Sequence, residues 1–180
     1  MVNAWLKEQD IELKAQVIDE NALRQQAAEA KADGDSVGGE IACTVTGLPA
    51  GLGGPGWREA VESELARHLF AIPAVKALGF GDGAALAHMR GSRANDPLRT
   101  DGTCVRTVTN HNGGINGGVT NGMPLTFTVT FKPTPSIALP QDTVDLSRME
   151  NCTVAVTGRH DPCIALRAAP IVEAAAALAL

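Results

Sequence analysis

The sequence predicts an α+β fold, in which an antiparallel sheet packs on helices, and three observations lead to this class. Apolar and polar residues alternate in residues 11–19, 38–49 and 124–137, a pattern typical of half-buried strands. Residues 20–35 and 57–72 carry helix formers or apolar residues at helical spacing. The chain has 180 residues and is 44% hydrophobic, which is enough for one domain with its own core.

The first strand and helix lie near the N-terminus. IELKAQVID (11–19) alternates apolar and polar residues, and ENALRQQAAEAKADGD (20–35) holds helix formers up to a stop at Gly34. Ahead of them, VNAWLKEQ (2–9) is typical of the last turns of a helix, but no N-cap residue precedes it. We therefore expect the chain to begin inside an element.

A second strand and helix follow. GGEIACTVTGLP (38–49) is β-branched and alternating, and after a turn-rich loop WREAVESELARHLFAI (57–72) has apolar residues at helical spacing. AVKALGFGDG (74–83) predicts a short strand that ends in a glycine turn. PLTFTVTFKPTPSI (124–137) begins as a strand in which Thr alternates with Val or Phe. We expect both predicted helices to pack on one face of an antiparallel sheet that contains these strands.

The last segment, PIVEAAAALAL (170–180), predicts a helix. Pro170 stands at a position favoured at helix starts, and the residues after it are apolar almost all round to Leu180. Neither a capping Gly nor a terminal Lys or Arg follows them. We therefore expect the chain to end inside an element as well.

Charge and hydropathy exclude several classes of protein. The formal net charge of −5 lacks the basic footprint of a general nucleic-acid binder. Every apolar stretch is broken by Gly, Pro or a charge well short of a membrane span, and the N-terminus MVNAWLKEQD lacks the features of a signal peptide. We expect a soluble, cytoplasmic protein with neither a nucleic-acid nor a membrane partner.

The cysteines do not predict a metal site. Their spacing contains no C-x-x-C pair, so neither a zinc ribbon nor a dithiol redox motif is indicated. A site built from Cys152, His160 and Cys163 would match no standard zinc finger. We expect reduced thiols at all four positions, which are Cys43, Cys104, Cys152 and Cys163.

The stretch TNHNGGINGGVTNG (109–122) holds five glycines and four asparagines in fourteen residues. Glycine adopts positive φ without steric cost and lets other groups approach the backbone, while asparagine tolerates the left-handed region. Two interpretations stay open. The stretch is either a set of tight turns between strands or a cradle for a phosphate or a flat cofactor.

Two further segments contain candidate anion-binding residues. Lys132 follows a predicted strand, between prolines and hydroxyls that suit it to hold an anion, although a solvated lysine at a strand end is the alternative. GRHDPC supplies Arg159, His160 and Asp161 in a row, which gives a forked cation, a group that titrates near neutrality and a carboxylate. Such a triplet is also compatible with a surface ion pair.

Taken in order, these segments resemble the chorismate synthase family. The motifs are GDGAALAHMRGSRANDP (81–97), TNHNGGINGGVTNGMP (109–124), FKPTPSI (131–137) and GRHDPCIALRAAPIVEAA (158–175). The resemblance is to the C-terminal half of the family and covers essentially the whole chain. It implies one partial domain over residues 1–180, forming half of a β-α-β sandwich.

The resemblance implies a carbon–oxygen lyase. Members convert 5-enolpyruvylshikimate 3-phosphate to chorismate by anti-1,4-elimination, the last common step of the shikimate pathway to the aromatic amino acids. They use reduced FMN without net redox change, so the protein holds two anionic molecules in contact. The family is cytoplasmic and homotetrameric, and the flavin reductase activity of some members makes NADP a further associated ligand.

Residue by residue, the resemblance transfers flavin contacts from three motifs and the glycine-rich stretch. Asp161 matches the carboxylate proposed to take a proton from the flavin, Arg159 also matches a substrate ligand, and His160 is expected to be structural. The expected flavin contacts are Pro73, Ala74, Gly117, Lys132, Pro133, Thr134, Pro135, Ser136 and Arg159.

The family's N-terminal half has no counterpart in this sequence. That half carries a G-E-S-H-G segment, an R-S-S flavin segment, both catalytic histidines and several substrate-binding arginines. We therefore expect a partial chorismate synthase that is active only when completed, with a non-catalytic remnant that binds an anion, flavin or partner subunit as the alternative. Activity of the chain alone would require substitutes among His68, His88 and His111.

Overall fold

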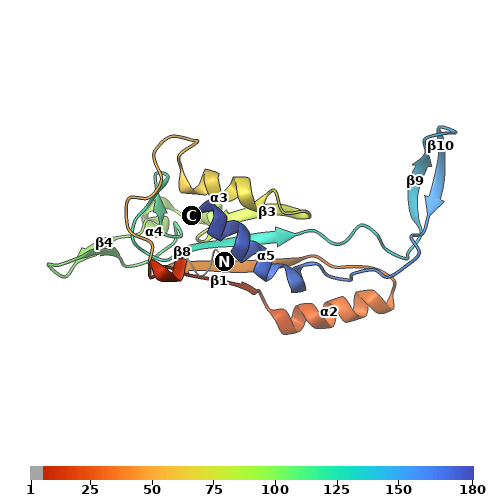
Figure 1. Cartoon of the computed structure of the whole chain (residues 1–180), viewed down its shortest axis with the longest axis horizontal. Coiled ribbons are helices and arrows are strands. Elements are labelled where there is room, and N and C mark those ends of the chain that lie inside the picture. Colours follow the sequence, from red (N-terminus) through yellow and green to blue (C-terminus); the bar gives the residue numbers. More distant parts are fainter. Residues whose placement is uncertain (1–5) are drawn as a thin grey trace.

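Four antiparallel strands form the central sheet. In the computed structural model, which describes residues 6–180, they pair in the order β1-β2-β8-β3 (Figure 1). The strands are β1 (Glu12–Val17), β2 (Gly39–Thr46), β8 (Leu125–Phe131) and β3 (Val75–Phe80). The predicted alternation of buried and less buried residues is present in β8, where every second residue is buried. The α+β class with an antiparallel sheet on helices is confirmed.

Helices cover one face of this sheet. Ile41, Cys43 and Val45 of β2 point to that face and are almost completely buried. Helices α3 (Val61–Leu69) and α5 (Ala165–Ala179) belong to the same core. Helix α2 (Glu20–Ala32) reaches the core through Leu23 and Ala27, close to Gly39. At Gly39 an added Cβ would come within 2.7 Å of both Leu23 and Ala165, so glycine permits this close packing.

Two helices differ from their predicted bounds. Helix α3 begins at Val61, and Trp57 is 76% exposed, because the residues before Val61 form turns. The prediction that Pro170 starts the last helix is wrong, since α5 begins at Ala165 and Pro170 lies inside it. The buried first turns, with Ala165 and Ala168 each 1% exposed, explain the earlier start. Burial of small residues thus outweighs the hydrogen bond that a proline removes.

The N-terminal helix prediction falls partly outside the described residues. Residues 6–8 are helical, whereas residues 2–5 lie outside the part of the chain that the structure describes. Leu6 is 1% exposed, so this turn is packed against the rest of the protein. Within residues 6–180, no helix is both long enough and apolar enough to cross a membrane.

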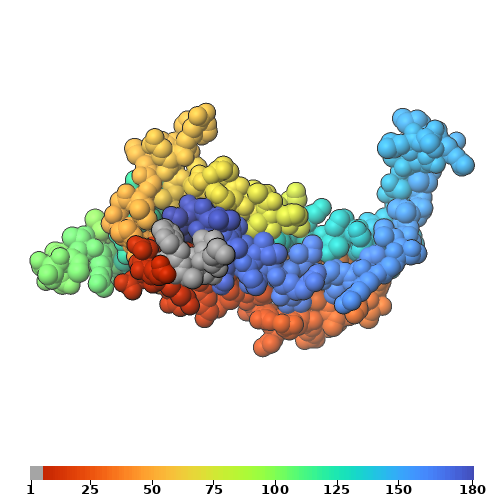
Figure 2. All heavy atoms as spheres, in the orientation of Figure 1, coloured from red at the N-terminus to blue at the C-terminus, as the bar shows by residue number. Residues whose placement is uncertain are grey.

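Two hairpins extend from opposite ends of the elongated molecule (Figures 1 and 2). One consists of β4 (Leu98–Thr100) and β5 (Val105–Thr107), the other of β9 (Gln141–Asp145) and β10 (Glu150–Val154). Each forms a separate two-stranded sheet. The remaining short elements are η1 (Gly83–His88), α4 (Gly91–Ala94), β6 (Ile115–Asn116) and β7 (Val119–Thr120).

Candidate functional site

A short segment between α2 and β2 joins two of the predicted site motifs. The Ser36 hydroxyl donates to the Thr134 carbonyl at 2.7 Å, and the Val37 N–H donates to the Pro162 carbonyl at 2.8 Å. The KPTPS and RHDPC motifs therefore lie on either side of this segment, although 28 residues of chain separate their first described contacts. One side-chain and one backbone hydrogen bond thus fix both motifs at the same end of the sheet.

The segment that holds Pro73 and Ala74 meets the KPTPS motif where β3 begins. The Lys132 N–H donates to the Ala74 carbonyl at 2.9 Å, directly after the Val75–Phe131 strand pair. Ala74 has φ 72°, in the left-handed region that a residue with a Cβ seldom adopts. This bend places Pro73 and Ala74 against the start of the KPTPS motif.

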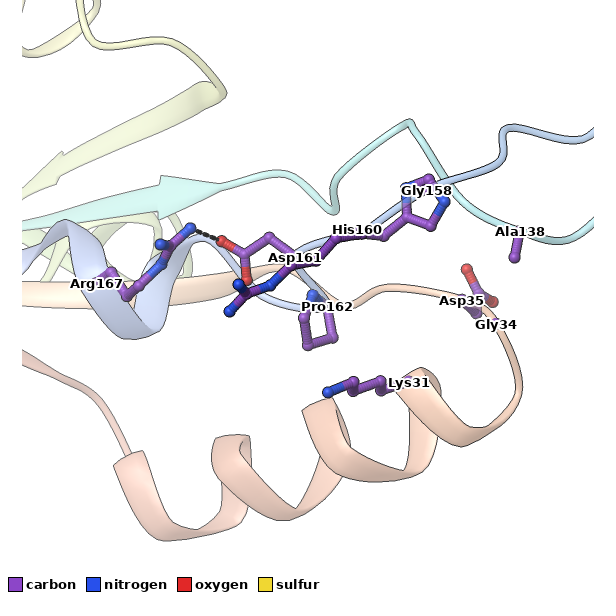
Figure 3. A pocket seen from close by; sticks show the side chains of 10 residues that line it. Lys31, Gly34, Asp35, Ala138, Gly158, His160, Asp161, Pro162 and Arg167 are labelled. Atoms are coloured by element: carbon purple, nitrogen blue, oxygen red, sulfur yellow. Dashed lines mark hydrogen bonds and ion pairs between the residues drawn. The ribbon is translucent and has the colours of Figure 1, made fainter.

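An open hollow of about 700 Å³ lies beside these motifs (Figure 3). Helix α2 contributes Lys31, the loop before α5 contributes Arg159 and Asp161, and α5 contributes Arg167. Its volume falls in the range of small-molecule sites, about 300–1,000 Å³. The full lining consists of Lys31, Gly34, Asp35, Ala138, Gly158, Arg159, His160, Asp161, Pro162 and Arg167.

The charges around this hollow are unevenly paired. Asp161 forms an ion pair with Arg167 and also accepts the Cys163 N–H at 3.3 Å. Lys31 and Arg159 form no ion pair with any other residue between 6 and 180. Two cations without a carboxylate partner suit a phosphate or carboxylate group from a ligand.

Two polar side chains near the hollow behave differently. The His160 ring nitrogen Nε2 lies 2.9 Å from the Val156 carbonyl oxygen, so the ring is engaged by its own segment. The Thr134 hydroxyl is buried and has no hydrogen-bond partner among the described residues. Because an unpaired buried hydroxyl costs about 1–3 kcal/mol, Thr134 is a position where a bound group would add stability.

The glycine-rich stretch contains the predicted turns. Gly118 closes the β6–β7 turn, and its carbonyl accepts the Val61 N–H at 3.1 Å, which starts α3. A Cβ at Gly118 would lie 2.4 Å from the Gly54 carbonyl oxygen, so close backbone packing excludes a side chain there. At Gly117, by contrast, an added Cβ would meet nothing within 4 Å. Of the two glycines in this turn, Gly117 therefore borders open space and Gly118 does not.

The chain does not bring Gly117 to the other predicted site residues. The glycine-rich stretch joins the start of β8, where the Thr126 N–H donates to the Gly113 carbonyl at 3.1 Å. Lys132 follows the other end of the same strand. A strand of this length spans about 20 Å, so the two groups lie at opposite ends of β8.

Asp96 anchors the glycine-rich stretch to the motif before it. Its carboxylate accepts the Thr109 hydroxyl at 2.6 Å, the His111 N–H at 2.8 Å and the Asn112 N–H at 3.0 Å. Burial raises the pKa of Asp96, but these hydrogen bonds outweigh it and hold the pKa below its usual value. His111 also pairs with Asp82, at 2.6 Å between Nδ1 and Oδ2.

Sequence reasoning missed Lys31 and Asp96. Lys31 stands in the last turn of α2, where a cation is ordinarily explained by the helix dipole. Asp96 precedes a proline and was part of a longer motif without a role of its own. The hydrogen-bond partners of Asp96 lie 13 to 16 residues along the chain, and the hollow that Lys31 lines is formed by residues far from it in sequence, so only the fold reveals either arrangement.

The family model described as chorismate synthase matches residues 3–180. A chorismate synthase of Thermococcus gammatolerans is 51% identical over 165 residues, which cover 90% of this chain and 46% of that protein. One from Dehalococcoides mccartyi strain 195 is 48% identical over 159 residues, covering 88% of this chain and 43% of that protein.

A solved structure described as a crystal structure of chorismate synthase has a similar fold. Its TM-score is 0.79 at 20% identity, and the match covers 99% of this chain and 58% of the solved chain. The chain thus spans slightly less than half the length of the curated relatives that it matches.

Proposed function

This chain belongs to the chorismate synthase family, and we propose that it supplies the C-terminal half of an enzyme that converts 5-enolpyruvylshikimate 3-phosphate to chorismate and phosphate. The family uses reduced FMN, and the elimination it catalyses belongs to the shikimate pathway. In this proposal the complete enzyme is cytoplasmic and homotetrameric. The missing half supplies the acid at the leaving phosphate and further cations.

The observation that supports this function is that two cationic side chains line the hollow without a carboxylate partner. Substrate and FMN both carry phosphate, and the substrate also carries carboxylates. Lys31 and Arg159 line one hollow and have no carboxylate partner among residues 6–180. Arg159 offers a planar fork that binds a phosphate or carboxylate through two bonds, whereas Lys31 offers a point charge. These residues fit an anionic ligand.

The KPTPS motif extends this site toward β3. We assign flavin contacts to Lys132, Pro133, Thr134, Pro135 and Ser136, with Pro73 and Ala74 as backbone neighbours. The buried Thr134 hydroxyl and the unusual φ of Ala74 support a dedicated role for this corner. When bound, reduced FMN supplies electron density to the substrate as phosphate departs and recovers it as the ring hydrogen leaves.

Asp161 is assigned to accept a proton beside the flavin. Its ion pair with Arg167 and the hydrogen bond that it accepts from the Cys163 N–H hold the carboxylate at the edge of the hollow, where a base would have to stand. Gly117 is assigned a contact with one face of the flavin ring, because its turn is open on one side. Because Gly117 and Lys132 lie at opposite ends of β8, other groups must line the flavin site between these two residues.

A titration of FMN tests this assignment. The chain is joined to the N-terminal half of the Thermococcus gammatolerans relative, and FMN fluorescence is followed for the parent and for Arg159→Met, Lys132→Met and Arg24→Met. Arg24 lies on the exposed side of α2 and serves as the matched control. We expect the two site variants to bind FMN or substrate about tenfold or more weakly, and most clearly at low salt. Equal binding by all four proteins would refute the assignment.

A further inference from the structure

The two projecting hairpins carry opposite charges. The basic arm, residues 98–107, contains Arg99 and Arg106 against Asp101. The acidic arm, residues 141–154, contains Asp142, Asp145 and Glu150 against Arg148. The arms lie at opposite ends of the molecule, so they cannot meet within one copy (Figure 2). Neither arm contributes a residue to the hollow described above.

Each arm also places like charges directly opposite each other. Arg99 pairs with Arg106 across β4 and β5, and Asp145 pairs with Glu150 across β9 and β10. Like charges at facing positions destabilise a hairpin. In the basic arm, the remaining acid is occupied, because Asp101 accepts the N–H groups of Thr103 and Cys104. In the acidic arm, Asp145 accepts the N–H and the hydroxyl of Ser147 and pairs with Arg148 at 3.8 Å, whereas Asp142 and Glu150 form no ion pair with any residue between 6 and 180. A partner of opposite sign would therefore serve the two arginines of the basic arm and these two acids.

Exposed apolar residues accompany these charges. Leu98 and Val105 of the basic arm are 63% and 62% exposed, and Leu146 and Met149 of the acidic arm are 77% and 82% exposed. An isolated two-stranded hairpin is at best marginally stable in water. Both arms therefore have the composition of a contact surface that combines apolar area with charge.

We propose that the basic arm of one copy docks on the acidic arm of a second copy of this chain. In a two-fold antiparallel pair, the end that bears the basic arm lies beside the partner's acidic end, and the contact forms twice. Arg99 and Arg106 then face the acidic arm of the other copy, in which Glu150 has no cation partner among the described residues of its own copy. Two identical contacts close the pair, whereas a single end-to-end contact would leave an arm of each sign uncovered.

Two native cysteines allow a direct test. Cys104 lies in the basic arm and Cys152 in the acidic arm, both exposed, whereas Cys43 and Cys163 are buried. A flexible bis-maleimide should join Cys104 of one copy to Cys152 of another, and peptide mapping of the dimer band identifies the linkage. Cys104→Ser and Cys152→Ser should each lose the dimer, while their equimolar mixture should regain it. A dimer linked only through Cys104–Cys104 or Cys152–Cys152 would overturn the proposal.

Reversing the charges of one arm distinguishes specific docking of the two arms from cross-linking by random collision. The variant Arg99→Glu with Arg106→Glu has two acidic arms, and Asp145→Lys with Glu150→Lys has two basic arms. Each alone should lower the yield of the cross-linked dimer about tenfold, and the mixture of both should restore it because opposite charges again meet.

Lys7→Glu with Arg24→Glu is the control matched to Arg99→Glu with Arg106→Glu, since both replace two cations by two carboxylates and the control residues are exposed and lie outside both arms. It should cross-link like the parent. Circular dichroism establishes that each variant is folded before cross-linking. If the folded reversed variants alone cross-link as well as the parent, or if the parent gives no Cys104–Cys152 linkage at low salt, the proposal fails.

Discussion

The neighbouring glycines Gly117 and Gly118 provide a matched pair of positions for testing the glycine-rich stretch. Both have positive φ, 60° and 82°, so asparagine suits the backbone at either position better than valine or alanine. They differ in surroundings. An added Cβ at Gly118 would lie 2.4 Å from the Gly54 carbonyl oxygen and 2.9 Å from the Ala60 Cβ, whereas at Gly117 it would meet nothing within 4 Å.

This difference sets the expected loss of stability. At Gly118 the collision involves backbone that cannot rotate away, so overpacking costs about 1–3 kcal/mol. Displacement of its carbonyl also weakens the bond to the Val61 N–H at the start of α3, worth about 1 kcal/mol. Gly118→Asn should therefore lower the free energy of unfolding by about 2–4 kcal/mol, and Gly117→Asn by less than about 1 kcal/mol.

Urea denaturation followed by circular dichroism measures both changes. The same two substitutions, made in the chain joined to the N-terminal half of its Thermococcus gammatolerans relative, test the proposed contact of Gly117 with the flavin. Gly117→Asn adds a side chain on the open side of the turn, where the flavin would lie. We expect it to weaken FMN binding while the fold persists. Equal stability of Gly117→Asn and Gly118→Asn would refute the packing argument, and unchanged FMN affinity of Gly117→Asn would remove Gly117 from the site.

Three further predictions concern other parts of the molecule. Burial, and then the charge of Glu173, raises the pKa of Cys43 from 9.0 to about 12, so between these pH values the folded protein keeps a proton that the unfolded protein releases. The free energy of unfolding should therefore fall by ~1.4 kcal/mol for each pH unit in this range, and Cys43→Ala should flatten this part of the pH–stability curve. Glu173→Ala removes the acceptor of the Ala15 N–H at 2.9 Å and should cost about 1–3 kcal/mol in urea denaturation, against no change for exposed Glu29→Ala. In the completed enzyme, Asp161→Asn should lower anaerobic turnover about 10²-fold or more with FMN affinity nearly kept, and normal turnover would exclude Asp161 as the base.

Strands β2 and β8 were the most predictable because each buries alternate residues, whereas β1 alternates only between exposed and half-buried residues. Alternation in residues 124–137 correctly located β8, and the prolines after Lys132 correctly limited it. The two projecting hairpins were not predicted, because they bury almost nothing and their exposed faces show no apolar periodicity. The early start of α5 was missed for a different reason, since Pro170 matches the residue type favoured at the first helical position, although the five residues before it are good helix formers.

The candidate site was only partly predictable. The resemblance pointed to Arg159 and Asp161, which do line one hollow, and to Lys132, which meets Ala74 nearby. Local sequence could not reveal that Lys31 of α2 joins them, because 128 residues separate it from Arg159. Nor could it show that Gly117 lies at the other end of β8.

Anaerobic formation of chorismate tests the central claim most directly. The chain alone and the chain joined to the N-terminal half of its Thermococcus gammatolerans relative are each supplied with reduced FMN and 5-enolpyruvylshikimate 3-phosphate. We expect turnover only in the joined protein, because the proposed function places the acid and part of the anion site in the other half, and loss of one positioned acid costs about 10²–10⁴ in rate. Measurable turnover by the chain alone, or none by a folded joined protein that binds FMN, would contradict the account.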